Sequence, residues 1–217
     1  MKKTLYSMML SDDVIREIDL LAHRRGTNRS NLVNQILAEH VKLRTPEQRI
    51  SDIFNEIEEL MSATQIVPKV TEGAPSMALR SCLEYKYRPT VRYEVELLPA
   101  VTNGRIGSLS VVFRTQSSAL LEVLTDFFRI FSRIEQKYLP FEVGYLLEDG
   151  KFTRSLSCPI SNGSEKTGLS AKELAVIISD YIRLFDRLLK AYVAGNLTPD
   201  GIAAEYAAEL ENRSILI

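Results

Sequence analysis

The first forty-five residues most constrain what this chain can fold into, because they carry one strand pattern and two helix patterns but too few residues for a core. Residues 4–10 (TLYSMML) alternate as a β-strand does, with successive side chains on opposite faces. A single strand cannot form a sheet, and a unit of this size cannot bury enough apolar surface alone. The pattern therefore predicts a dimer in which two such strands pair as an antiparallel ribbon beneath four helices.

The residues between the two helix patterns fit the rules for helix ends. Ser11 is a candidate N-cap of the first helix, and Gly26 is a candidate left-handed C-cap. Arg24 and Arg25 precede Gly26, where positive charge suits the exposed carbonyl groups. Asn28 is then a good N-cap for the second helix. The stretch RRGTNRSN is predicted to be a helix stop, a tight turn and a helix start.

This order of elements resembles the ribbon-helix-helix superfamily, which includes the Arc and methionine repressors. The resemblance covers about the first fifth of the chain, and the remainder resembles no family that we recognise. The matching residues are Leu5, Tyr6, Ser7, Met8, Met9 and Leu10 in the strand, Ser11, Asp12, Asp13, Ile15, Ile18, Leu21 and Gly26 in the first helix and its end, and Asn28, Arg29, Ser30, Asn31 and Leu32 opening the second helix. The resemblance implies a dimer core made of Tyr6, Met8, Leu10, Ile18, Leu21, Leu32 and Ile36.

Members of that superfamily insert the ribbon into the major groove of double-stranded DNA. The resemblance implies base contacts from Lys3, Leu5, Ser7 and Met9. It also implies that phosphates lie at the start of the second helix, where backbone N–H groups point outward. The implied phosphate-contacting residues are Lys2, Asn28, Arg29 and Ser30.

Two of the implied base-reading residues depart from the superfamily's pattern. Leu5 and Met9 can contact a thymine methyl group, but they cannot form the bidentate hydrogen bonds that contribute about 1–3 kcal/mol of discrimination per base. Two alternatives follow. Either the DNA is read through methyl groups, Ser7 and DNA shape, or the ribbon mainly dimerises.

Charge is distributed unevenly along the chain. Through Thr45, eight Lys and Arg residues stand against five Asp and Glu residues, which gives +3. The whole chain carries −1, so the remainder carries −4. A mildly basic segment attached to an acidic body is compatible with a nucleic-acid-binding module joined to another domain.

The remainder of the chain predicts the α+β class, with a mainly antiparallel sheet and helices on one face. Thr45, Pro46 and Gln48 predict a further helix start. Predicted elements then follow as strands within 79–89, 90–99 and 104–115, a helix at 118–139, a hairpin at 141–160, a helix at 171–193 and a last short helix after Pro199. The predicted domains are 1–45 for DNA binding and dimerisation, 46–78 as a helix and linker, and 79–217 as an effector, partner-binding or oligomerisation domain.

Several functional classes are not expected from the sequence. No apolar run approaches the ~18 residues of a membrane span, and no signal-peptide pattern occurs at the N-terminus, so a cytoplasmic location is expected. Cys82 and Cys158 lie far apart, and His23 and His40 both precede residue 45, so no metal site of usual spacing is expected. No catalytic motif is present, so neither an enzyme nor a cofactor is expected.

The expected function is that of a homodimeric, sequence-specific DNA-binding protein, a bacterial, phage or plasmid transcriptional regulator. Its acidic body would bind a small-molecule effector or a protein partner, or build higher oligomers. The alternative is a DNA-anchoring or dimerisation component of a conjugation, plasmid-partition or toxin–antitoxin complex, in which the C-terminal domain binds a protein partner.

Overall fold

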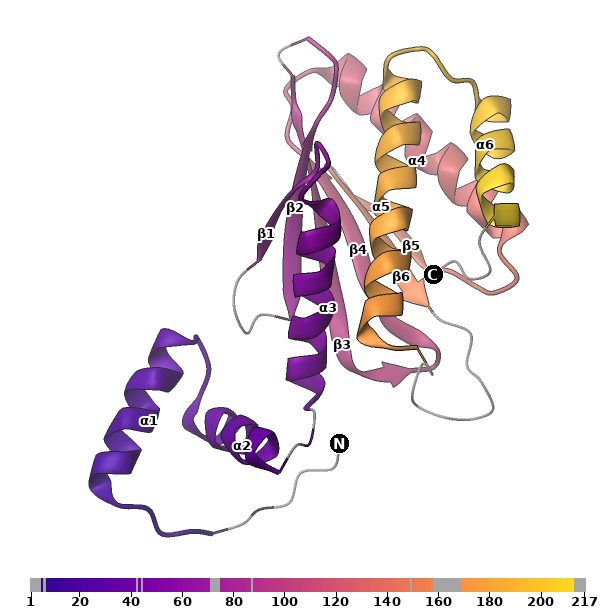
Figure 1. Ribbon diagram of the computed structural model, residues 1–217. Helices are drawn as coiled ribbons and strands as arrows, with labels where there is room; N and C mark the ends of the chain where they lie inside the picture. The colour runs from indigo at the N-terminus through magenta and orange to yellow at the C-terminus, as the bar shows by residue number, and fades with distance from the viewer. Residues whose placement is uncertain are drawn as a thin grey trace.

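The computed structural model describes residues 5, 7–41, 43, 45–70, 75–86, 88–148, 150–157 and 169–212. Two short helices, α1 and α2, stand apart from a larger body in which helices cover a β-sheet (Figure 1). In chain order the elements are α1 (Asp12–Arg24), α2 (Arg29–His40), α3 (Pro46–Met61), β1 (Val67–Val70), β2 (Ser76–Cys82), β3 (Thr90–Thr102), β4 (Arg105–Phe113), α4 (Ser118–Tyr138), β5 (Tyr145–Glu148), β6 (Lys151–Ser157), α5 (Ala171–Val193) and α6 (Pro199–Asn212).

The six strands form one sheet in the order β1-β2-β3-β4-β6-β5, and every neighbouring pair is antiparallel. The predicted α+β class and antiparallel sheet are therefore confirmed. The β3–β4 hairpin turns at Asn103 and Gly104, whose φ angles are 51° and 77°. Asn and Gly tolerate these left-handed conformations, so the residue types at this turn fit its backbone.

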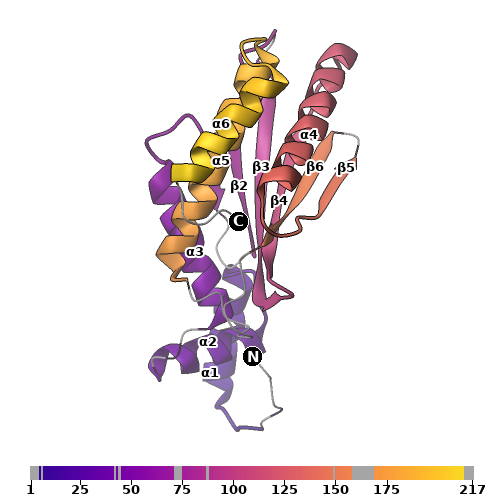
Figure 2. The same cartoon turned by 90° about the vertical axis from the view of Figure 1, so that its right-hand side faces the viewer.

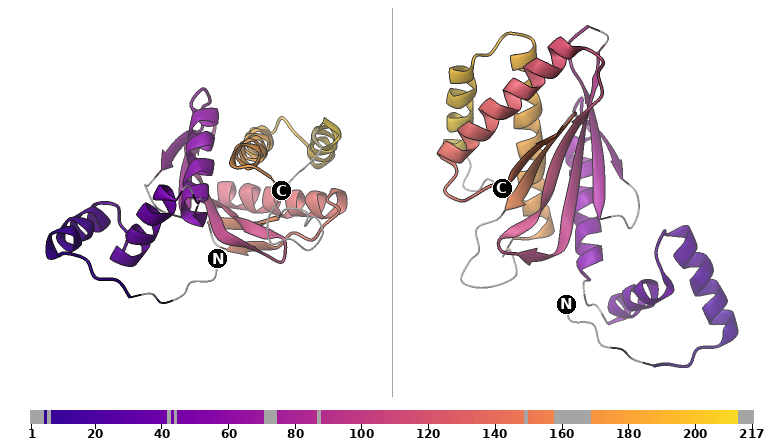
Figure 3. Two further views of the ribbon diagram at one scale, coloured as in Figure 1. Left: turned by 60° about the horizontal axis from the view of Figure 1, so that its bottom comes forward. Right: turned by 180° about the vertical axis from the view of Figure 1, so that it is seen from behind.

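The helices of the body cover one face of the sheet. α3, α4 and α5 pack on that face, and α6 packs against α4 and α5 (Figures 2 and 3). Aromatic side chains fill the space between these layers. The ring of Phe128 on α4 stacks on Phe152 of β6, with centroids 4.7 Å apart, and both lie close to Phe185 of α5. Alternation along the strands explains the arrangement, because every second side chain of β6 points to the helices.

Residues 46–78 contribute α3, β1 and the start of β2 to the body. α3 begins as predicted, with a capping box: the Thr45 hydroxyl accepts from the Gln48 N–H at 3.1 Å, and the Gln48 side chain accepts from the Thr45 N–H at 2.9 Å. α3 then packs alongside α5. β1 was not predicted because Pro68 disfavours a strand reading. The structure places it at the edge of the sheet, where a proline is tolerated.

The predicted N-terminal strand is wrong. Leu5 and residues 7–10 have irregular structure, and helices α1 to α3 occupy residues 12–61 without a ribbon before them. Leu5 and Met9 are 97% and 99% exposed. Alternation alone does not make a strand, because a strand also needs a neighbour for its backbone hydrogen bonds. No described part of the chain pairs with this segment, so the ribbon-helix-helix assignment fails at its defining element.

Candidate functional site

The most unusual part of the molecule is the segment of residues 5–43, here called the head. Its two helices are joined by the turn that the sequence predicted. Gly26 has φ +61°, its N–H donates to the His23 carbonyl at 3.2 Å, and the Thr27 N–H donates to the Ala22 carbonyl at 3.0 Å. Asn28 then caps α2, since its side-chain oxygen accepts from the Asn31 N–H at 2.9 Å. The helix stop, turn and helix start are thus confirmed.

The head buries very little of its own apolar surface. Only three of its described hydrophobic residues are buried: Ala22, Leu32 and Ala38. None of them belongs to the continuous hydrophobic core of the body. Two are alanines, so the contact between α1 and α2 rests mainly on Leu32, which is fully buried. Such a small contact is insufficient to hold two isolated helices in one arrangement.

Most of the exposed apolar surface of the molecule lies in the head. Fourteen large hydrophobic side chains are exposed in the described part of the chain, and ten of them belong to this segment. These ten are Leu5, Met8, Met9, Leu10, Val14, Leu20, Ile36, Leu37, Val41 and Leu43. So many exposed apolar side chains in one short segment favour contact with another protein or with a second copy of the same chain.

Cationic side chains gather at the turn between α1 and α2. Arg24, Arg25 and Arg29 are all exposed. Arg29 is paired with Asp19 of α1: its Nε donates to Oδ1 at 2.7 Å, and its Nη2 donates to Oδ2. These hydrogen bonds lower the pKa of the Asp19 carboxyl and raise the pKa of Arg29. Arg24 and Arg25 have no ion pair with any described residue, so they are the cations most available to an anionic partner.

The structure brings some of the predicted site residues together and separates others. Asn28, Arg29 and Ser30 gather at the start of α2, although the Asn28 side chain is occupied as the cap and Arg29 by Asp19. The predicted base-contacting residues Leu5, Ser7 and Met9 are exposed on irregular backbone, so they do not share a strand face. Lys2, Lys3 and Tyr6 lie outside the described residues.

The predicted dimer-core residues are buried to different extents in the single chain. Leu32 is fully buried, while Ile18 and Leu21 are partly buried. Met8 and Ile36 are 50% and 42% exposed, and Leu10 is 38% exposed. Their role in a dimer remains a prediction, but the exposed members belong to the apolar surface of the head.

The sequence reasoning missed a buried ionic cluster in the body. Glu135 of α4 and Arg154 of β6 are both fully buried, and the Arg154 Nε donates to Glu135 Oε2 at 2.9 Å. Three tyrosine hydroxyls also donate to this carboxylate: Tyr145 at 2.9 Å, Tyr181 at 3.0 Å and Tyr206 at 3.1 Å. The signal was present in the sequence, because alternation along β6 places Arg154 between the inward-facing Phe152 and Leu156.

The surroundings of this cluster indicate a structural role. Burial raises the pKa of Tyr145, Tyr181 and Tyr206, and the nearby Glu135 carboxylate raises it further. The phenols therefore stay protonated and keep donating to Glu135. The cluster links α4, α5 and α6 to the β5–β6 hairpin, and it fixes how these elements sit on one another.

A second buried group, in which a tyrosine also donates to a carboxylate, lies nearer the centre of the sheet. Tyr93 of β3 donates to Asp186 of α5 at 2.8 Å, and Lys190 pairs with the same carboxylate at 2.7 Å. Burial, together with the Asp186 charge, raises the pKa of Tyr93 well above its usual value. Both groups tie helices to strands inside the core.

The described residues contain no group of three or more His, Cys, Asp or Glu side chains placed to hold a metal ion. No described helix is long and apolar enough to cross a membrane.

Comparison with models of known protein families found no match, so the resemblance to ribbon-helix-helix proteins has no support there. Comparisons with characterised proteins and with solved structures found no match either.

Proposed function

We propose that this protein is a homodimeric, sequence-specific DNA-binding protein that acts as a transcriptional regulator. The observation that supports the proposal is the head, which combines uncovered apolar side chains with exposed arginines at one turn, two of which have no ion pair among the described residues. The apolar surface supplies the dimer contact, and the arginines supply the contact with DNA. The body is the regulatory part.

A second copy of the chain is the partner that best explains the apolar surface. Each copy brings the same patch, so a two-fold axis can bury both patches against each other. Exposed hydrophobic side chains of both heads would be removed from water in such a contact. The dimer thereby supplies the core that α1 and α2 lack as a single chain.

The turn between α1 and α2 is the part of the head best suited to phosphate. Arg24 and Arg25 are exposed there, and the first backbone N–H groups of α2, at Arg29 and Ser30, have no acceptor within the helix. A helix start beside cations attracts anions. Pairing two heads doubles the number of phosphate contacts, which raises both the affinity and its dependence on salt.

The phosphate contact is tested by measuring the affinity for duplex DNA over a range of salt concentrations. We expect a steep salt dependence, and the double variant Arg24→Ala, Arg25→Ala should reduce its log–log slope by about 2 per head. Arg133→Ala removes an exposed arginine from α4 of the body and is the matched control. A salt-independent affinity, or an equal loss in the control, would disprove this assignment.

Sequence specificity is tested by retaining genomic DNA fragments on the purified full-length protein at moderate salt and sequencing them. Enrichment of a repeated motif, in inverted or direct orientation, is the expected result for a dimeric regulator. Uniform recovery of all fragments would reject the regulator and favour a protein that anchors a complex to DNA.

One feature of the sheet favours the second candidate. This candidate is an anchoring or dimerisation component whose body binds a protein partner. β1 and β5 are its two edge strands. β1 carries Pro68 and Lys69, which protect an edge from pairing. β5 carries neither residue type, and its Leu146 is 54% exposed. No described segment pairs with the outer edge of β5, so an extended strand of another protein can add there.

A further inference from the structure

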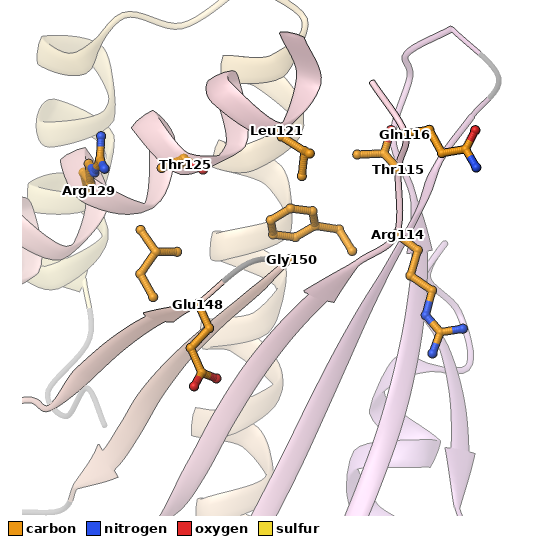
Figure 4. Close-up of a pocket in the computed structure, with 10 residues that line it drawn as sticks. Arg114, Thr115, Gln116, Leu121, Thr125, Arg129, Glu148 and Gly150 are labelled. Carbon is orange, nitrogen blue, oxygen red and sulfur yellow. The ribbon is translucent and has the colours of Figure 1, made fainter. Parts of the chain in front are cut away.

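A groove opens in the body between the N-terminal half of α4, the connection formed by residues 114–117, and the tip of the β5–β6 hairpin (Figure 4). Its volume is about 890 Å³, which falls within the range of sites that hold a small molecule. The groove lies away from the head, so its occupant is independent of the dimer and DNA contacts proposed above.

Local structure explains why this groove is open. Ser117 caps α4 by accepting from the Leu120 N–H at 3.3 Å, and Thr115 accepts from the Ser117 N–H at 3.1 Å, so the helix starts only after a short extended connection. The hairpin tip is held against the end of β4, because the Phe113 N–H donates to the Gly150 carbonyl at 3.0 Å. Gly150 has φ +74°, which glycine adopts without strain, and a side chain there would crowd the Phe113 carbonyl.

The floor of the groove is apolar. Phe113 is 5% exposed and its ring stacks on Phe128, with centroids 5.5 Å apart. Leu121 of α4 and Leu147 of β5, both partly buried, also line the groove. Leu121 is followed at four-residue intervals by Thr125 and Arg129, which places all three on one flank of the helix. A hydrocarbon chain or ring lying on these side chains would be removed from water together with them.

The charges around the floor favour an anion. The charged lining residues are Arg114, Arg129 and Glu148, which give a net charge of +1. Arg114 has no ion pair with any described residue. Arg129 has only a long pair with Asp126 at 3.8 Å, and both side chains are more than 60% exposed, so that contact is weak. Figure 4 shows Arg129 on α4 and Arg114 just after β4, on opposite sides of the groove.

We propose that this groove binds a small amphipathic carboxylic acid, whose apolar body lies on Phe113, Leu121 and Leu147. The carboxylate pairs with Arg114, and Arg129 supplies a second positive charge along the helix. A guanidinium matches a carboxylate with two parallel hydrogen bonds, which an alcohol cannot reproduce. The charge and the apolar body of the ligand are therefore both required for binding.

The test is calorimetric titration of the full-length protein with sodium octanoate below its micelle concentration, at two temperatures so that burial of apolar surface gives a measurable heat at one of them. Octan-1-ol and octylammonium carry the same chain without the negative charge. We expect octanoate to bind once per chain and both analogues to bind at least tenfold more weakly. Absence of saturable heat at both temperatures, or equal binding of the three probes, would overturn the proposal.

Variants locate the site within the body. Arg114→Gln should weaken octanoate binding about tenfold, and Arg129→Gln should weaken it less. Thr125→Trp should block the groove and abolish binding while leaving the unfolding temperature close to that of the parent, since Thr125 is only partly buried. Arg133→Gln, on the same helix but outside the groove, is the control and should bind as the parent does. An equal loss in the control, or unchanged binding by Thr125→Trp, would place the acid elsewhere and reject the assignment.

Discussion

The head and the body use apolar residues in opposite ways. The body buries nearly all of its large hydrophobic side chains in one core between the sheet and α3, α4, α5 and α6. The head buries only Ala22, Leu32 and Ala38, and it exposes ten large hydrophobic residues. In Figures 1 and 3 it stands apart from the layers of the body. The body therefore has a continuous core as a single chain, whereas the head leaves most of its large hydrophobic side chains uncovered.

The two regions also differ in how they use charge. In the body, Glu135, Arg154, Asp186 and Lys190 are turned inward and paired, which fixes the packing of helices on strands. In the head, Arg24 and Arg25 are turned outward without a partner in the described chain. Buried, paired charges favour one structure, while exposed charges attract a ligand of opposite sign. The comparison supports the proposal that the head, rather than the body, binds a large partner.

The largest effect is expected when the buried cluster of the body is disrupted. Glu135→Ala leaves Arg154 buried without its counter-charge and removes the acceptor of three tyrosine hydroxyls. We expect the free energy of unfolding to fall by about 3–5 kcal/mol in a denaturant titration. Glu122→Ala, an exposed position on the same helix, should change it by no more than about 0.5 kcal/mol. A loss below 1 kcal/mol in the first variant would show that the cluster does not stabilise the body.

The next effect is a loss of stability at alkaline pH. Tyr93 and Tyr181 are fully buried and their pKa values are raised well above 10.0, so the folded state holds these protons after the unfolded chain has released them. Stability is then full below pH 10 and falls as the pH rises above it, by about 2.7 kcal/mol per pH unit for the two groups. Denaturation at pH 9, 10 and 11 measures the slope. Tyr93→Phe should reduce the slope by one group's share, about 1.4 kcal/mol per pH unit, and an unchanged slope would contradict the assignment.

A smaller effect concerns the apolar surface of the head. Leu37→Asp places a charge in the proposed dimer contact, where Leu37 is 48% exposed in the single chain. We expect the dimer dissociation constant, measured by analytical ultracentrifugation, to rise about thirtyfold, or ~2 kcal/mol. Unfolding of the body should not change. Asn34→Asp adds the same charge at an exposed polar position of α2 and should leave the dimer intact. A monomeric parent protein would reject the dimer itself.

The smallest effect compares matched helix caps in the two regions. Asn28→Ala removes the cap of α2, and Ser170→Ala removes the cap of α5. Each substitution should cost about 1 kcal/mol. The first should increase hydrogen exchange in α2 alone, whereas the second should lower the stability of the whole body. If Asn28→Ala lowered both to the same extent, the head and the body would unfold as one unit.

Local features were predictable because they depend on neighbouring residues. The Gly26 turn, the Asn28 cap and the Thr45 capping box were read from residue types and spacing, and the structure has all three. The alternation in β3, β4 and β6 likewise indicated an antiparallel sheet. By contrast, the alternation of residues 4–10 predicted a strand wrongly, because its pairing partner was expected from a second copy of the chain, and the described residues of this segment have irregular structure.

The candidate sites were less predictable because they depend on contacts between distant segments. Arg29 was expected to face phosphate, but its side chain is held by Asp19, ten residues away on α1. The groove combines the end of β4, a flank of α4 and the tip of the β5–β6 hairpin, and no motif links these segments in the sequence. Alternation along the strand indicates that Arg154 is a charged residue facing inward, but its partner Glu135 was identifiable only in the folded chain.

The sequence by itself determined the helix ends, the turns, the class of the body and the concentration of cations near residue 25, because these follow from short-range preferences and side-chain periodicity. The tertiary structure alone decided which apolar residues stay exposed, which charges are paired, and where a groove remains open. Those outcomes depend on how elements pack in three dimensions, since burial and ion pairing are properties of neighbours in space and not of neighbours along the chain.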